Sequence, residues 1–153
     1  MNRFLIFAAF LVPIQVLAVV CDRYNGSYQV TECLSGWPGK MQPDMTYSAM
    51  DIAHQPNSSE LAMTYYYSQS DHFTVNYMAD SQDHPGDGVN TGSSYSASCS
   101  KNGIVTTRFG LLKWPLISTV TRALNGIKYV ESFEGGDGWT RTCTFARTSS
   151  PDL

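Results

Sequence analysis

Hydrophobic and polar side chains alternate along short runs of this chain. In the run 60–67, large apolar side chains alternate with smaller or polar ones: one side carries Leu61, Met63, Tyr65 and Tyr67, and the other begins with Glu60, Ala62 and Thr64. A similar alternation recurs at 72–79, 94–101 and 139–147. A period of two places one face of a strand against a core and leaves the other in solvent. Weaker runs lie at 27–33, 45–53, 104–109, 117–124 and 127–133. All of these except 45–53 are rich in the β-branched and aromatic residues that favour strands.

The run 45–53 is open to a second interpretation. Asp44 could cap a short helix there, with one face formed by Met45, Ala49 and Ile52. The residue types of this run do not decide between a helix and a strand, so we keep both as predictions.

Turn residues separate the runs. Asn102-Gly103 and Asn125-Gly126 are pairs preferred by the type I′ turn of a tight hairpin, in which both central residues need a positive φ. The runs amount to about eight or nine strands spaced by about 8–12 residues, which is typical of a sandwich or a barrel. Hairpin-length links favour a meander, and a long meander closes on itself to remove its edges. We therefore predict an all-β fold: a small antiparallel up-and-down barrel of about eight strands, with a β-sandwich as the alternative.

The start of the first expected strand offers one family resemblance. Gly26-Ser27-Tyr28 resembles the G-x-W pattern near the beginning of lipocalins, with Tyr28 in place of the tryptophan. The resemblance implies a barrel that is lipocalin-like in shape. Because it covers three residues, it carries over no binding residue, and we assign the chain to no family.

The N-terminus has the layout of a secretory signal peptide. Arg3 provides a basic start, residues 4–12 form an apolar run, and Ala18 ends a V-x-A cleavage pattern. We predict that residues 1–18 are a signal peptide and that 19–153 form a single β-barrel domain. The protein is then expected to be secreted or periplasmic.

Two other fates of the N-terminus remain open. The apolar stretch 4–20 is near the lower limit of length for a retained membrane helix. Cys21 could also carry a lipid, although Val20 is larger than the residue that usually precedes a lipid-modified cysteine. Neither alternative changes the domain that follows.

The four cysteines all follow the predicted leader. They are Cys21, Cys33, Cys99 and Cys143. No two of them have the C-x-x-C spacing, which argues against a zinc or redox motif. An even number in an exported chain indicates two disulfides, for which three pairings are possible. We favour Cys21–Cys33, which bracket the first turn, and Cys99–Cys143, which both lie on the apolar side of their runs.

Charge and composition limit the classes of molecule that this protein is expected to bind. The chain has a formal net charge of −3, with 15% charged residues and neither a basic patch nor a run of like charges in the sequence. Nucleic acid binding depends on clustered Lys and Arg, so we do not expect it. Beyond the leader, no segment is long and apolar enough for a membrane helix, so we expect no membrane partner after leader removal.

The sequence contains no recognisable catalytic or metal motif. Ser98 and Lys101 have an S-x-x-K spacing, but in a strand they would point to opposite faces. Asp71-His72 could be half of a triad, although no G-x-S-x-G elbow accompanies it. The carboxylates of the loop 80–88 could bind Ca²⁺, yet their spacing does not match an EF-hand. We predict no catalytic site, metal or cofactor, and keep a small hydrolase with an unrecognised site as an alternative.

An aromatic cluster is the candidate binding site. Tyr65, Tyr67, Phe73 and Tyr77 share the apolar faces of two adjacent runs, where they could either pack a core or line a wall for a small apolar or aromatic ligand. The leading hypothesis is therefore a ligand-binding barrel. The alternative is a structural or interaction protein, such as an inhibitor or an envelope component, that acts through its loops and has a packed interior.

Two charged residues also lie on apolar faces. Glu131 and Arg141 could pair inside a closed barrel, or lie near the rims where water reaches them. We expect the rim position.

Overall fold

The computed structural model describes residues 21–56, 58–67, 70–86, 93–110 and 114–149. A short 3₁₀ turn, η2 (Asp22–Tyr24), precedes the strands. The strands are β1 (Gly26–Trp37), β2 (Lys40–Pro43), β3 (Ala49–His54), β4 (Glu60–Tyr66), β5 (His72–Met78), β6 (His84–Pro85), β7 (Ser94–Ser100), β8 (Gly103–Phe109), β9 (Leu116–Ala123), β10 (Gly126–Phe133) and β11 (Thr140–Ser149).

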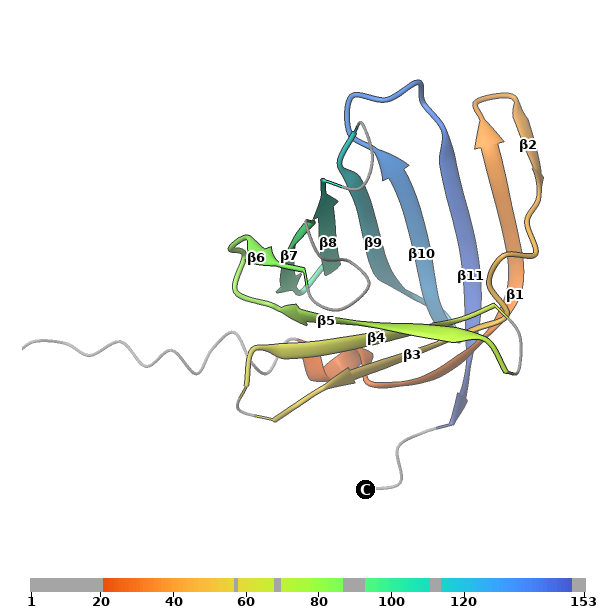
Figure 1. The fold of residues 1–153 in the computed structure, drawn as a ribbon. Helices are drawn as coiled ribbons and strands as arrows, with labels where there is room; N and C mark the ends of the chain where they lie inside the picture. The colour runs from red at the N-terminus through yellow and green to blue at the C-terminus, as the bar shows by residue number, and fades with distance from the viewer. Residues whose placement is uncertain (1–20, 57, 68–69, 87–92, 111–113, 150–153) are drawn as a thin grey trace, which may run out of the picture.

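The strands form one antiparallel sheet that curls into a nearly closed barrel (Figure 1). Its order is β5-β4-β3-β1-β11-β10-β9-β8-β7-β6, and β2 pairs with β1 off this path. The first and last long strands pair from Ser27↔Ser149 to Gly36↔Thr140. This pairing confirms the predicted barrel over the sandwich, although ten strands follow the barrel path instead of about eight.

The barrel has a seam between β5 and β7, where no ladder joins the strands. The backbone N–H of Ser81 donates to the carbonyl oxygen of Ala97 across it, at 2.9 Å. The rings of Tyr77 and Tyr95 meet edge to face, with centroids 5.7 Å apart. One backbone hydrogen bond and one ring contact therefore bridge part of the seam.

Strand β3 resolves the ambiguous run 45–53. Ala49–His54 pairs with β1 on one side and β4 on the other, so its backbone groups are satisfied as a strand. Asp44 caps no helix. It accepts a hydrogen bond from the backbone N–H of Thr46 at 2.8 Å, in the turn that leads to β3.

The hairpins at the two Asn-Gly pairs form, but not as predicted. Ser100 pairs with Gly103 and Ala123 with Gly126, so each glycine begins the next strand. Neither asparagine has a positive φ, so the type I′ prediction is wrong. A Cβ on Gly126 would overlap the carbonyl oxygen of Phe145 on the neighbouring strand, so this glycine is required for close backbone approach.

Both disulfides form, with pairings different from those predicted. The bonds are Cys21–Cys99 and Cys33–Cys143. Cys33 and Cys143 lie directly opposite each other in the β1–β11 ladder. The predicted Cys99–Cys143 bond does not form, because each of these cysteines is bonded to another partner and β8, β9 and β10 lie between their strands in the sheet. Both cysteines nevertheless face the interior, as their alternation predicts, and two disulfides indicate an oxidising compartment.

The predicted leader 1–18 lies outside the described residues, and its removal stays a prediction. Among the residues that the structure describes, no helix has the length and apolar character needed to cross a membrane.

Candidate ligand-binding site

The four aromatic residues singled out from the sequence line one interior cavity. On β4, Tyr65 faces inward and pairs in register with Phe73 on β5. Their rings stack with centroids 4.8 Å apart, and Tyr67 stacks on Phe73 at 5.5 Å. Tyr77 borders the same cavity. Alternation on two paired strands thus brings the predicted set together.

Two further tyrosines complete the aromatic wall. The ring centroid of Tyr47 lies 5.5 Å from that of Tyr65 and 5.8 Å from that of Tyr67. Tyr129 meets both Tyr47 and Tyr65 edge to face at 5.9 Å. Tyr129 shares the alternating face of its strand with Ile127, so the pattern could have identified it. Tyr47 lies between β2 and β3, where no periodic pattern identifies it.

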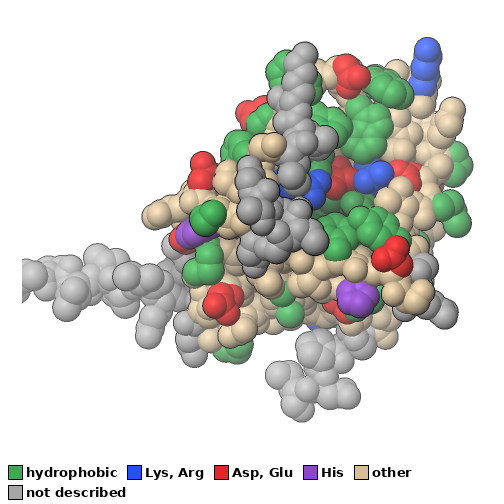
Figure 2. All heavy atoms as spheres, viewed as in Figure 1, with side chains coloured by type: hydrophobic (Ala, Val, Ile, Leu, Met, Phe, Trp, Pro, Cys, Tyr) green, Lys and Arg blue, Asp and Glu red, His purple; other side chains and the backbone are tan. Residues whose placement is uncertain are grey.

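The cavity is small. Its volume is about 70 Å³, whereas a liquid water molecule takes about 30 Å³ and pockets for drug-sized ligands about 300–1,000 Å³. Figure 2 shows the end of the barrel at which acidic and basic side chains lie among hydrophobic ones in a central hollow. We call this end, where the cavity lies, the mouth. The cavity has room for a head group but not for a long chain.

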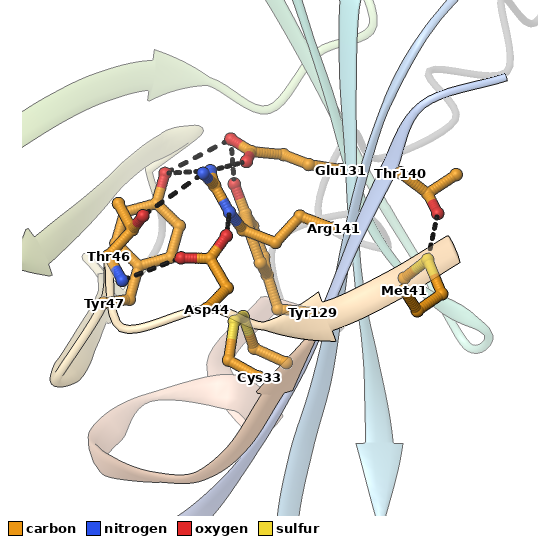
Figure 3. A network of polar contacts seen from close by, with 10 residues as sticks. Cys33, Met41, Asp44, Thr46, Tyr47, Tyr129, Glu131, Thr140 and Arg141 are labelled. Atoms are coloured by element: carbon orange, nitrogen blue, oxygen red, sulfur yellow. Dashed lines mark hydrogen bonds and ion pairs between the residues drawn. A yellow bond between two sulfur atoms is a disulfide. The ribbon is translucent and has the colours of Figure 1, made fainter. Parts of the chain in front are cut away.

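A buried ion-pair network adjoins the aromatic wall (Figure 3). Arg141 Nη1 lies 2.5 Å from Glu131 Oε2, and Arg141 Nε lies 2.7 Å from Asp44 Oδ2. The Tyr129 and Tyr47 hydroxyls donate to Glu131 Oε1 at 2.7 and 3.3 Å. Glu131 is only 4% exposed, so the expected rim position is wrong and the two charges pair inside the barrel.

The network sets the protonation of its members. Burial disfavours the charged form of Asp44, but hydrogen bonds from Thr46 and Arg141 outweigh it and hold the pKa of this carboxyl well below its usual range. Burial also disfavours the charged form of Arg141. Its hydrogen bond to Asp44 and its attraction to Glu131 outweigh burial and raise the pKa of Arg141 above its usual value. Burial, reinforced by Glu131, raises the pKa of Tyr47. The tyrosine therefore acts as a neutral donor beside a permanent cation.

Arg108 is the other charged residue that borders the cavity. It extends from β8, two positions beyond the buried Thr106, and so on the inward face. Its Nε is buried without a hydrogen-bond partner, and no ion pair involves Arg108 in the described part of the chain. Burial raises the pKa of Tyr77, while the charge of Arg108 lowers it in part. The alternating pattern that identified Glu131 as a charge on an apolar face could have identified this arginine too.

A larger cavity opens at the seam. It measures about 570 Å³ and is bordered by residues of β3, β4, β5, β6 and β7, with Tyr77 common to both cavities. The hydroxyl of Tyr95 is buried beside it without a hydrogen-bond partner.

The remaining candidate motifs do not assemble into a site. Ser98 lies in strand β7, and Lys101 lies in the turn beyond it, not on a helix. The ring of His72 packs on Tyr66, with centroids 5.4 Å apart. In the loop 80–88, Asp80 pairs with His84, and within the described residues no group of three or more His, Cys, Asp or Glu could hold a metal. Positions 87 and 88 lie outside the described residues.

No family model and no curated protein sequence matches this chain. Solved structures with a similar fold include a Schistosoma mansoni fatty acid binding protein in complex with arachidonic acid, with a TM-score of 0.60 and 10% identity over 85% of this chain and 99% of that one. A mutant of the fluorescent protein UnaG has a TM-score of 0.60 and 6% identity, over 83% and 97%. Secretory abundant heat soluble protein 4 from Ramazzottius varieornatus has a TM-score of 0.61 and 8% identity, over 84% and 96%. At these identities the likeness shows the fold alone, a nearly closed antiparallel β-barrel.

Proposed function

We propose that this protein is an exported, non-enzymatic barrel that binds a small ligand with an anionic group and an apolar or aromatic body. The observation that supports it best is Arg108, a cation on the wall of an aromatic cavity with no carboxylate paired to it in the described residues. The Nε of Arg108 is buried without an acceptor, and such an unsatisfied donor is costly. A carboxylate, sulfate or phosphate group would relieve that cost with charge-assisted hydrogen bonds.

The proposed body of the ligand lies toward the mouth. Tyr67 is 41% exposed there, and its ring stacks on Phe73, which leaves aromatic surface for an apolar chain or ring. The cavity of about 70 Å³ takes only the head group, so the rest must displace side chains or extend outward. The complex of a similar barrel with arachidonic acid supports an acid with a long apolar chain as the first class to test.

The test compares three probes of equal chain length: a fatty acid, its methyl ester and its alcohol. Titration calorimetry would measure the affinity of each probe for the native protein, for an Arg108→Gln variant and for a Lys40→Gln control. Lys40 suits the control because it is exposed on β2. We expect the acid to bind tightest and Arg108→Gln to weaken it about tenfold to a hundredfold, as expected for loss of a charged hydrogen bond. Equal affinity for acid and ester, or an unchanged acid affinity in the Arg108→Gln variant, would refute the proposed site.

The alternative is a structural or interaction protein that acts through its loops. The small interior cavity favours it, because a packed interior is what such a protein needs. Native mass spectrometry of protein purified from its own host separates the two functions. A fixed added mass would indicate a bound ligand, whereas an unliganded monomer that also binds none of the three probes would favour the interaction role. The denatured mass would test cleavage after Ala18.

A further inference from the structure

The end of the barrel opposite the mouth gathers arginines that are far apart in the sequence. Arg23 lies within η2, Arg122 lies near the end of β9, and Arg147 lies near the end of β11. Together with Leu124 they border a concavity of about 400 Å³. We call this surface the arginine end. The sequence showed no basic patch because these residues meet only when the barrel closes.

The guanidinium groups at the arginine end bond to backbone carbonyls. Arg23 Nη1 donates to the carbonyl oxygen of Lys101 at 3.4 Å, and Arg122 Nη2 donates to that of Arg23 at 3.4 Å. Neither Arg23 nor Arg122 forms an ion pair with any described residue, and the nearby Asp22 pairs with His54. Both cations therefore keep donors for an external anion.

An apolar side chain projects beside the cations. Leu124 is 98% exposed at the turn between β9 and β10. Isolated exposed leucines are ordinary, but one beside several arginines matches the interfacial zone of a bilayer. There, guanidinium groups meet lipid phosphates and an apolar side chain enters the acyl boundary.

The predicted leader would also bring this end of the barrel close to a membrane. The apolar stretch 4–20 runs directly into Cys21, and the Cys21–Cys99 disulfide fixes Cys21 at the end of β7 that adjoins Lys101. During export the folded barrel would therefore meet the bilayer with its arginine end, whether or not the leader is later removed.

We propose that the arginine end docks on the phosphate head groups of an anionic bilayer and leaves the mouth pointing away from the membrane. The protein as a whole carries a net charge of −3, so the attraction to an anionic bilayer must come from the arginine end alone. The expectation of no membrane partner rested on the lack of a second apolar segment, and surface docking does not need one. This inference is independent of the ligand proposed for the cavity.

The test measures co-sedimentation with vesicles of phosphatidylcholine, with and without phosphatidylglycerol. The full chain is expressed with export, and the quantity compared is the ratio of binding to the two vesicle types, so a retained leader does not bias the result. The variant Arg23→Gln/Arg122→Gln is matched with Lys40→Gln/Lys128→Gln, which removes the same charge from exposed positions on β2 and β10. Leu124→Ser tests the apolar contact.

We expect the native protein and the lysine control to prefer the anionic vesicles, and the arginine variant to lose about thirtyfold of that preference. Each arginine near an anionic surface contributes about a factor of five. Salt at about 0.5 M should abolish the preference by screening. Equal losses in the arginine and lysine variants would overturn the proposal. So would binding of inorganic phosphate without binding of vesicles. Because both arginines form only long hydrogen bonds, the variants should melt like the native protein, and Leu124→Ser should weaken binding without any change of charge.

Discussion

Replacing Arg141 by methionine removes the one cation that serves two buried carboxylates. Arg141 bonds to Glu131 at 2.5 Å and to Asp44 at 2.7 Å. Methionine has a comparable length and no donor, so packing is largely kept while both carboxylates lose their partner. The experiment therefore isolates the electrostatic role of the guanidinium.

The magnitude follows from the burial of the partners. Breaking a buried pair by removing one member costs about 3–5 kcal/mol, because a charge stays buried without compensation. Arg141 has a side-chain exposure of 16%, against 6% for Glu131, so water reaches the gap only in part. We expect Arg141→Met to lower the free energy of unfolding by about 3–5 kcal/mol, a large share of a typical total of about 5–15 kcal/mol.

Chemical denaturation with a double-mutant cycle provides the assay. Glu131→Gln removes one charge but keeps hydrogen-bonding capacity, so it should cost about 1–3 kcal/mol. The double variant should cost at least about 1 kcal/mol less than the sum, because the two residues interact directly. The exposed Lys128→Met control should change stability by less than about 0.5 kcal/mol. Additive effects, or a loss below about 1 kcal/mol for Arg141→Met, would refute the reasoning.

Three further outcomes follow from the fold. Replacing Cys33 and Cys143 by serine should cost about 4–5 kcal/mol on chain-entropy grounds, since 110 residues separate the two; peptide mapping that finds a different pairing would refute this arrangement. Gly126→Ala should destabilise the barrel by about 1–3 kcal/mol in denaturant titrations, because its Cβ would overlap the carbonyl oxygen of Phe145; an unchanged midpoint would count against that close approach. Because Asp44 has a lowered pKa in the folded state, the unfolded chain takes up its proton first, so stability should be fully present above about pH 4 and fall on further acidification; Asp44→Asn should flatten that part of the profile.

Much of the candidate site was predictable from alternation. On β4 and β5 a period of two is a local property of the chain, so Tyr65, Phe73 and Tyr77 could be placed on inward faces without knowledge of their neighbours. The same parity marks Arg108 as an inward charge. That these residues bind a ligand remains a proposal, because alternation assigns a face and not an occupant.

The hairpins show the limit of local patterns. Asn-Gly pairs correctly predicted tight links, yet their glycines are required for contact with a third strand and not for turn geometry. A turn preference describes a few consecutive residues. The carbonyl oxygen of Phe145 is distant in sequence from Gly126, so only the assembled sheet reveals the constraint.

The sequence alone determined the strand class, the inward faces and the presence of two disulfides, because each depends on residue type and on spacing within short runs. The tertiary structure decided which cysteines pair, that Glu131 meets Arg141 inside the barrel, and that Arg23 and Arg122 share one end. These contacts join residues whose separation in space is set by strand order and by the closure of β1 on β11. Closure is a property of the whole sheet, so no short segment of the chain contains the information that specifies it.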